Sequence, residues 1–237
     1  GLGFEIAQPG VKSSNARNNG NISATQRGSG EASASGRVAD NGESSIRLGI
    51  VEAGWTTDAD GFVHYGIGIK NQSSTASVEY PTIKIIGYSE SGSVIFSDER
   101  VFGPIGPGQT SYYGDQAGNG TSPARVEFKP VKPQDYAITA PSETPAIEIN
   151  DTSAVEDDSG ITSFTGLLAL KGTPEESDAY QLALSIILRN EAGEIVAGYS
   201  DYITCPASGG SIAFSVDAYD PPTYSSYEVH ASQQQRW

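Results

Sequence analysis

The sequence predicts an all-β fold of two tandem β-sandwich domains that follow a polar N-terminal arm. Three observations support this prediction. Apolar residues recur at every second position in several short runs, as in strands with one buried face. Gly (28) and Pro (13) are frequent in the 237 residues, which suits short strands joined by many turns. The whole pattern then returns 101 residues later, as expected for two copies of one domain.

The clearest element is a hairpin at Tyr80–Val94, which is matched without a gap by Gln181–Ile195. Both stretches have an alternating run that ends in a polar turn with a Gly, whose positive φ suits a short hairpin loop. The alternating apolar residues are expected in the core, whereas the opposite face is expected to lie in solvent. The expected core residues are Ile83, Ile85, Leu184 and Ile186, and the expected solvent-facing residues include Thr82, Lys84, Tyr88, Ser185 and Arg189.

The same offset extends to the neighbouring strands of both copies. Val63 to Ile69 then aligns with Phe164 to Leu170, and Tyr113 aligns with Phe214. Six or seven short strands in about 90 residues predict an immunoglobulin-like sandwich, without the Cys-Trp-Cys core of antibody domains. The predicted strands of the first copy are 46–52, 62–70, 80–88, 93–102, 109–114 and 124–129. The predicted domains are 46–131 and 147–237.

Residues 1–45 are predicted to form an arm or stalk, because they are rich in Ser, Asn, Gly and Ala and have few large apolar residues. A short strand is expected at 2–7, where Leu2, Phe4 and Ile6 alternate with small or polar residues. This strand is expected to pair along an open sheet edge, in its own subunit or in a neighbouring one. Residues 132–146 are expected to be an extended, stiff linker, because Pro fixes φ and removes a hydrogen-bond donor.

The net charge of −15 disfavours nucleic acid and anionic membrane surfaces as partners. The charge is uneven, since residues 138–237 hold 15 acidic and only 3 basic residues. Such a surface is typical of an extracellular protein, and the alternative is a surface that binds or steers cations. No run approaches the roughly 18 apolar residues that a membrane span needs, so membrane insertion is not expected.

Three short turn stretches occur at matching places in both copies. They are Lys70-Asn71, Ser89–Val94 and Pro104–Gln109 in the first copy, and Lys171-Gly172, Asn190–Ile195 and Cys205–Gly210 in the second. Over about 170 residues this pattern resembles that of bacterial FxLYD-type immunoglobulin-like domains. Where that family has Leu-Tyr-Asp, this chain has Ile86-Gly87-Tyr88 and Leu188-Arg189-Asn190. The resemblance implies a small secreted or surface-anchored bacterial domain, and it transfers no catalytic residue.

Few residues suggest chemistry. His64 and His230 are the only histidines, and neither has a second His at zinc-ligand spacing. Cys205 is the only cysteine, and it is expected to be a partly buried small apolar residue rather than a nucleophile. Lys70 and Lys171 at strand ends are expected to be solvated, with an intramolecular isopeptide bond as the alternative.

Two acidic loops are candidate calcium sites, because calcium prefers several oxygen ligands and Asp-x-Asp-Gly matches the start of an EF-hand loop. The candidate ligands are Asp58, Asp60, Asp157 and Asp158. The alternative is that these residues only turn a hairpin. No other cofactor is expected.

Aromatic residues near strand ends are candidates for a sugar-binding or protein-binding platform. The alignment places Tyr113 and Tyr227 in the core instead. The candidates are Tyr112, Tyr113, Tyr219, Tyr224 and Tyr227, with Trp55 and Trp237 lying apart.

The favoured hypothesis is a non-enzymatic module, extracellular or on a bacterial cell surface, that acts as a spacer or binds a protein or glycan ligand. The alternative is a subunit of a filament or pilus-like assembly, in which copies pair through the strand with Leu2, Phe4 and Ile6. An enzyme is disfavoured, because no nucleophile, base and orienting group occur together.

Overall fold

A computed structural model describes residues 47–141, 146–171, 181–204 and 209–233. These residues are almost entirely strands and turns, which confirms the predicted all-β class. The first repeat contains β1 (Leu48–Thr57), β2 (Val63–Asn71), β4 (Thr82–Tyr88), β5 (Val94–Val101), β6 (Thr110–Ala117) and β7 (Arg125–Pro130). The second repeat contains β9 (Ala146–Glu156), β10 (Ile161–Lys171), β11 (Gln181–Arg189), β12 (Ile195–Thr204), β13 (Ser211–Tyr219) and β14 (Ser226–Gln233).

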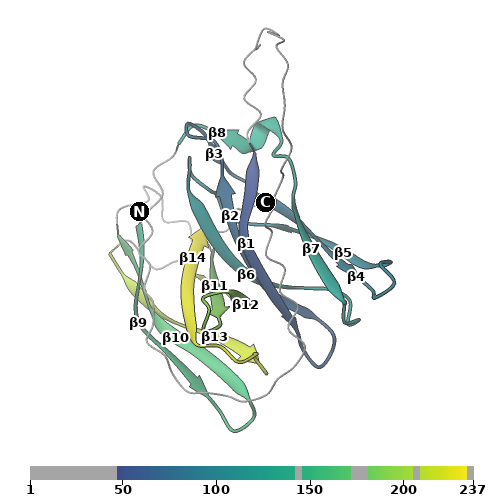
Figure 1. Cartoon of the computed structure of the whole chain (residues 1–237). Coiled ribbons are helices and arrows are strands. Elements are labelled where there is room, and N and C mark those ends of the chain that lie inside the picture. Colours follow the sequence, from purple (N-terminus) through teal and green to yellow (C-terminus); the bar gives the residue numbers. More distant parts are fainter. Residues whose placement is uncertain (1–46, 142–145, 172–180, 205–208, 234–237) are drawn as a thin grey trace.

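Each repeat forms two three-stranded antiparallel sheets with the same strand order. The sheets of the first repeat are β1-β2-β6 and β5-β4-β7, and those of the second are β9-β10-β13 and β12-β11-β14. Figure 1 shows the four sheets side by side, with β5-β4-β7 at one end and β9-β10-β13 at the other. The arrangement is consistent with a pair of β-sandwiches. The number of independently folding domains and their boundaries stay predictions.

The register between the repeats is 101 residues for four of the six strand pairs. The paired residues Ile85 and Asp98 correspond to Ile186 and Tyr199. In both hairpins a bulge lies directly before the last residue pair next to the turn. For the first two strands the structure corrects the offset to 99, because Ile50 opposite Ile69 recurs as Ile149 opposite Leu168. A two-residue shift preserves the alternation of buried and exposed positions, so the apolar pattern could not reveal it.

Each repeat has its own apolar core between its two sheets. The predicted core residues Ile83, Ile85, Leu184 and Ile186 are all at most 1% exposed, which confirms the inward face of β4 and β11. Tyr113 and Tyr227 are also buried, as predicted. Among the other fully buried residues are Val63, Tyr65, Ile67, Phe164 and Leu168.

The two middle sheets, β1-β2-β6 and β12-β11-β14, pack face to face through a row of glycines. Gly54, Gly66 and Gly114 lie directly opposite one another on β1, β2 and β6. A Cβ placed on Gly54 would lie 1.7 Å from the carbonyl oxygen of Ile195, and one on Gly114 would lie 2.7 Å from the backbone nitrogen of Tyr199. No side chain larger than hydrogen fits there, so the row lets β12 approach the backbone of the first repeat.

The contact overturns one prediction for the second repeat. Ser185 and Arg189 were expected in solvent, yet Ser185 is 3% exposed and the Arg189 side chain is 13% exposed. The alternating pattern identifies which face of β11 belongs to its own core. It does not show that the opposite face is covered by a second sheet.

The segment predicted as an extended linker is partly folded onto the first repeat. A 3-10 turn, η1 (Asp135–Ala137), leads into the short strand β8 (Ile138–Thr139), which pairs with β3 (Ser77–Val78). Pro133 and Ala137 are buried against this repeat. Tertiary contacts of these two apolar residues therefore override the stiffness expected from the prolines.

The predicted arm of residues 1–45, with its strand of Leu2, Phe4 and Ile6, lies outside the described residues, and its pairing stays a prediction. Within the described ranges the one helical segment is the three-residue turn η1, and no helix there has the length and apolar character of a membrane span.

Replacing Leu184 with Ala should lower the free energy of unfolding by about 2–5 kcal/mol, the usual cost of a cavity at a fully buried Leu. Urea unfolding monitored by circular dichroism measures this loss. The exposed Leu167 on β10 offers a matched Leu→Ala control that should change stability by about 0.5 kcal/mol or less. A loss below about 1 kcal/mol for Leu184→Ala would show that the inward face of β11 is misassigned.

Replacing Gly114 with Ala should lower the free energy of unfolding by roughly 1–3 kcal/mol, because an added methyl group forces the two middle sheets apart. Gly49→Ala is the control, since its new Cβ would meet the movable end of the Gln72 side chain rather than backbone. Equal stability of the two variants, measured by thermal unfolding, would contradict the close approach of β6 and β12.

Candidate functional site

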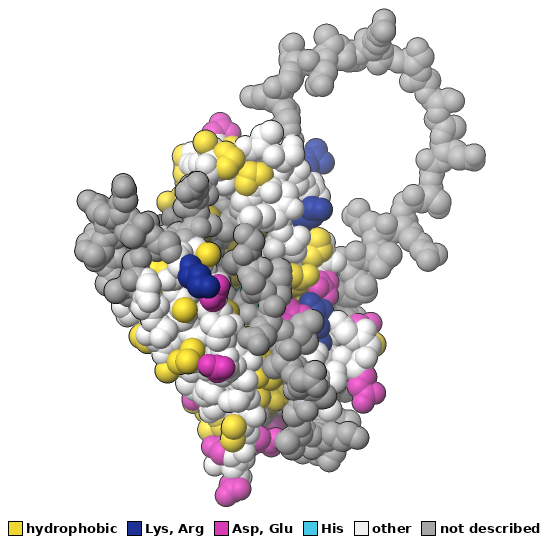
Figure 2. All heavy atoms as spheres, turned by 90° about the vertical axis from the view of Figure 1, so that its left-hand side faces the viewer, with side chains coloured by type: hydrophobic (Ala, Val, Ile, Leu, Met, Phe, Trp, Pro, Cys, Tyr) yellow, Lys and Arg dark blue, Asp and Glu magenta, His cyan; other side chains and the backbone are white. Residues whose placement is uncertain are grey.

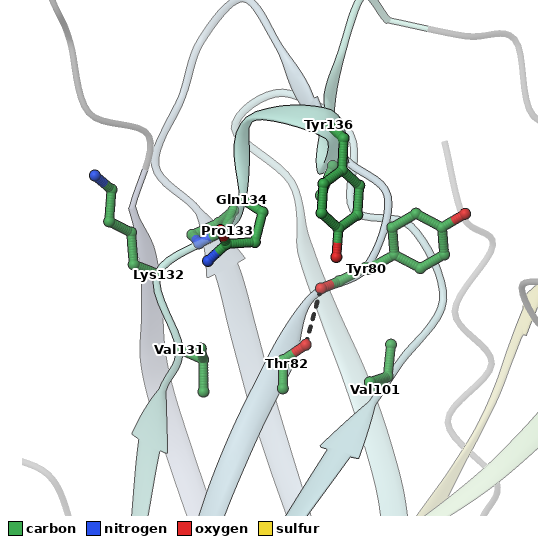
Figure 3. Close-up of a pocket in the computed structure, with 9 residues that line it drawn as sticks. Tyr80, Thr82, Val101, Val131, Lys132, Pro133, Gln134 and Tyr136 are labelled. Atoms are coloured by element: carbon green, nitrogen blue, oxygen red, sulfur yellow. Dashed lines mark hydrogen bonds between the residues drawn. The ribbon is translucent and has the colours of Figure 1, made fainter.

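The candidate binding site is a pocket of about 250 Å³ at one end of the β5-β4-β7 sheet. Its floor is a row of three outward-facing residues on adjacent chain segments: Thr82 at the start of β4, Val101 at the end of β5, and Val131 just after β7. The turn formed by residues 132–137 closes the upper side. Figure 3 shows the floor residues on neighbouring strands below this turn.

Two tyrosines stand at the pocket. The rings of Tyr80 and Tyr136 lie 6.1 Å apart and are inclined by 57°, so they form two walls rather than a stack. Tyr136 is 77% exposed, the highest value among the exposed large apolar and aromatic residues of the described chain. In Figure 3 the Tyr136 ring points from the turn toward Thr82, and the Tyr80 ring points sideways, away from Thr82.

The local sequence explains how these residues are held. Pro81 follows Tyr80 directly, and the hydroxyl of Thr82 donates to the carbonyl oxygen of Tyr80 at 3.1 Å, which fixes the entry into β4. On the other side, the Ala137 amide donates to Gln134 and the Glu79 amide donates to Ala137, which anchors the turn to the strand before β4. The pocket is therefore preformed by hydrogen bonds on both sides, from a side-chain hydroxyl at the start of β4 and from backbone amides in the turn.

The lining combines apolar and polar groups. Val101, Val131 and Pro133 offer apolar surface, and Gln134 and Lys132 also line the pocket, with the Lys132 side chain pointing away from the two tyrosines in Figure 3. Small-molecule sites are usually apolar pockets with a few polar groups that fix orientation. No nucleophile with an adjacent base lines this pocket, so its residues can bind and orient a ligand but contain no evident catalytic pair.

A second cluster of polar residues joins the two repeats. Arg189 on β11 donates to both carboxylate oxygens of Glu52 on β1, at 2.8 and 2.9 Å, and to Glu228 on β14 at 2.6 Å. Glu228 also contacts the Nε2 of His230 at 3.0 Å. The ring of Tyr112 on β6 lies beside both Arg189 and His230. We call these five residues the interface cluster.

The protonation states of the interface cluster suit a structural role. The hydrogen bonds from His230 and Arg189 outweigh burial and lower the pKa of Glu228 to about 2, and Arg189 similarly lowers the pKa of Glu52. Burial and Glu52 raise the pKa of Tyr112 to about 12. A general acid or base needs a pKa near the working pH, and none of these three groups has one.

The two histidines lie at the contact between repeats rather than in a catalytic group. His64 lies between the core residues Val63 and Tyr65 on β2, and its ring stacks on Tyr199 of β12 at 4.8 Å between centroids. Its Nε2 lies 2.9 Å from Asp58. His230 belongs to the interface cluster. Both rings are therefore covered by the packing of the middle sheets.

The candidate calcium ligands lie at equivalent hairpin turns. One carboxylate oxygen of Asp58 accepts hydrogen bonds from the amides of Asp60 and Phe62, and Asp157 accepts from Ser159 and Ile161 in the same way. Asp158 is exposed in the second turn. No group of three or more acidic, His or Cys residues that could hold a metal occurs in the described ranges. Calcium binding at these loops stays a prediction, and the turn-forming role is the one that the hydrogen bonds support.

The predicted aromatic platform is not assembled. Tyr112 is in the interface cluster, Tyr113 is in the first core, and Tyr224 and Tyr227 pack on Phe164. Tyr219 is 61% exposed on β13. Trp55 is buried in the first core, and Trp237 and Cys205 lie outside the described residues.

The strand-end lysines are solvent-accessible, as expected. Lys70 is exposed, and Lys171 forms an ion pair with Glu148 on the neighbouring strand β9.

Sequence reasoning missed Tyr80 and Tyr136, which lie 56 positions apart. The available signal was a tyrosine close to a proline in each region, since Pro81 follows Tyr80 directly and Tyr136 lies three positions after Pro133. A large aromatic residue in a polar, Pro-bearing loop has no core to enter, which is a reason to consider it for binding.

Replacing Arg189 with Met should lower the free energy of unfolding at pH 7 by about 1.5–3 kcal/mol, because two partly buried carboxylates lose a charged partner. The folded pKa of Glu228 is about 2 and the unfolded value is about 4.3, so this stabilisation exists above about pH 4.3 and disappears as the pH falls toward 2.

Urea unfolding at pH 7 and pH 3 measures the effect of Arg189→Met. The control is Lys171→Met, which removes an exposed ion pair and should change little. A loss for Arg189→Met that is the same at both pH values would attribute it to packing rather than to charge.

Comparisons with known proteins identify no family for this chain. No protein-family model matches the chain, and no curated protein matches it. Among solved structures, the crystal structure of the exo-chitosanase CsxA of Amycolatopsis orientalis matches with a TM-score of 0.23 and 12% identity. The match covers 77% of this chain and 26% of that protein, so the chain spans about a quarter of its length. A TM-score this low supports no conclusion on activity. The resemblance to FxLYD-type domains stays a prediction.

Proposed function

We propose that the chain is a non-enzymatic, extracellular or cell-surface binding module that presents the Tyr80–Tyr136 pocket on a rigid body of stacked sheets. The main support for this proposal is that the Tyr136 side chain is exposed beside a preformed pocket. A ring that is 77% exposed keeps apolar surface in contact with water, and a ligand that covers this surface gains binding free energy. The ligand classes that fit are a glycan or a protein segment.

The position of the pocket supports a binding role. It lies on the β5-β4-β7 sheet, at the end of the stack in Figure 1 that is farthest from the second repeat. Its floor belongs to regular strands, and its closing turn is tied down by hydrogen bonds. Sites on rigid elements lose less conformational entropy when they bind. The tight packing of the middle sheets then holds this pocket at a fixed orientation to the rest of the chain.

The spacer role follows from the same packing. The glycine row joins the repeats through close backbone contacts, and the interface cluster joins them through ion pairs. The described part of the chain should therefore move as one body rather than bend between the sandwiches. The filament alternative depends on residues 2–7, which lie outside the described ranges, and it stays a prediction.

Replacing Tyr136 with Ala should weaken ligand binding about tenfold or more, since stacking on an aromatic side chain and its burial are lost together. The full chain and the variant are compared on an array of neutral and acidic saccharides and on a peptide array. Tyr219→Ala is the matched control, because Tyr219 is an exposed tyrosine on the other repeat. Binding to no ligand on either array, or equal binding by Tyr136→Ala, would refute the proposal.

A further inference from the structure

The outer face of the β5-β4-β7 sheet continues below the pocket as a surface with an unusual pair of charges. Lys84 on β4 and Lys129 on β7 are direct cross-strand partners. Both belong to the outward-facing set, since the alternate residues Ile83 and Ile85 are in the core. Like charges directly opposite on neighbouring strands repel each other and destabilise a sheet. We call these two residues the lysine pair.

The lysine pair is only partly neutralised. Lys129 lies 3.2 Å from Glu127 and is 53% exposed, and the pKa of Glu127 is lowered by its hydrogen bond from Tyr88 and by Lys129. Lys84 makes no ion pair with any described residue, although Glu99 lies opposite it on β5. Glu127 therefore offsets the charge of Lys129, whereas the ammonium of Lys84 has no ion-pair partner among the described residues and is available to an anion from outside.

The lysine pair and the pocket form one continuous surface. Lys84 is two residues from Thr82 along β4, and Lys129 is two residues from Val131, so both lysines lie about 7 Å from the pocket floor on the same face. Arg125 lies farther along β7, and its guanidinium sits 3.8 Å above the ring of Tyr88. Glu127 lies 3.2 Å from Lys129 and 3.9 Å from Arg125, and Glu99 lies opposite Lys84. The face below the pocket therefore carries three cations and two carboxylates, an excess of one positive charge in a chain whose net charge is −15.

We propose that this surface binds an acidic polysaccharide, with one sugar ring against Tyr136 in the pocket and carboxylate groups on the lysine pair. The inference rests on the proposed binding function and names its ligand. Sugar rings offer an apolar face to an aromatic ring and hydroxyl groups to the Gln134 amide. Uronic acid residues add a negative charge at regular intervals, which matches a pocket followed by two cations.

The sheet geometry favours a saccharide over an acidic peptide. Peptides that bind sheets usually add a strand to a free edge, where main-chain hydrogen bonds supply affinity. Here the surface is the flat face of a three-stranded sheet whose central strand, β4, pairs on both sides. Side chains and an exposed ring, rather than backbone groups, are what this face offers to a ligand.

The test measures binding of the full chain to polygalacturonate, with pullulan as a neutral polysaccharide and poly-glutamate as an acidic peptide. Affinity electrophoresis or biolayer interferometry gives the dissociation constants. We expect polygalacturonate to bind tightest, and the double variant Lys84→Gln, Lys129→Gln to bind it about tenfold or more weakly than the parent chain.

Raising the salt to about 1 M, where the Debye length is about 3 Å, should also weaken the binding of polygalacturonate to the parent chain. The control Lys70→Gln should leave binding unchanged, since Lys70 is exposed on β2 away from this face.

The outcomes separate this inference from the proposed function. Equal binding of pullulan and polygalacturonate, with loss only in Tyr136→Ala, would overturn the acidic ligand and keep the binding module. Tighter binding of poly-glutamate would likewise overturn the saccharide. Binding of none of the three polymers, together with no hit on either array, would overturn both. The double variant relieves the repulsion between the lysines and loses the exposed Lys129–Glu127 ion pair, two small effects of opposite sign, so it should be about as stable as the parent chain in urea and a loss of binding would not reflect a loss of folding.

Discussion

The close approach of β12 to the glycine row is the contact on which the arrangement of the repeats depends. Gly54, Gly66 and Gly114 remove every Cβ from a line across the first sheet, and Gly198 on β12 meets that line from the other side. Two sheet faces normally pack about 10 Å apart through interdigitated side chains. Here hydrogen takes the place of side chains along the row, so side chains near it, such as Ile187 and Ile195, fill the rest of the contact. The interface cluster then fixes one end of this contact between the two middle sheets.

The same positions in the other copy carry side chains that prevent a further layer. The row equivalent to the glycines is Ser153, Thr165 and Ser215, which also lie opposite one another. Ser97 replaces Gly198 in the first repeat, since the pair of Ile86 and Ser97 corresponds to Ile187 and Gly198. Figure 2 views the molecule from the side of the β9-β10-β13 sheet and shows hydrophobic side chains in small, separate groups among polar ones. The two copies have therefore diverged: two faces are specialised for each other, and the two outer faces are not.

The sequence predicts the strands and cores well, because these depend on a period of two that is visible in Ile83, Ile85, Leu184 and Ile186. It does not predict which polar faces become buried, because Arg189 and Ser185 look the same in sequence whether water or a second sheet covers them. The glycines of the row are visible in the sequence, but their significance depends on three strands coming into register. The Tyr80–Tyr136 pocket was missed for a similar reason. Tyr80 lies just before β4 and Tyr136 lies in the turn after β7, and only the folded chain brings their rings together.

The charge distribution is compatible with the proposed site for an acidic ligand on an acidic chain. Most of the negative charge belongs to residues 138–237, with 15 acidic and 3 basic residues, whereas the lysine pair is on the outer face of the first repeat. The β1-β2-β6 sheet lies between that face and the nearest sheet of the second repeat. Sheets normally stack about 10 Å apart and the two middle sheets approach more closely along the glycine row, so the separation is somewhat below about 20 Å, or about twice the Debye length of about 8 Å at physiological salt. Repulsion from the second repeat is therefore screened at the pocket, and the local field there is set by Lys84, Lys129 and their neighbours. The rigid stack makes this separation permanent, which a flexible joint between the repeats would not.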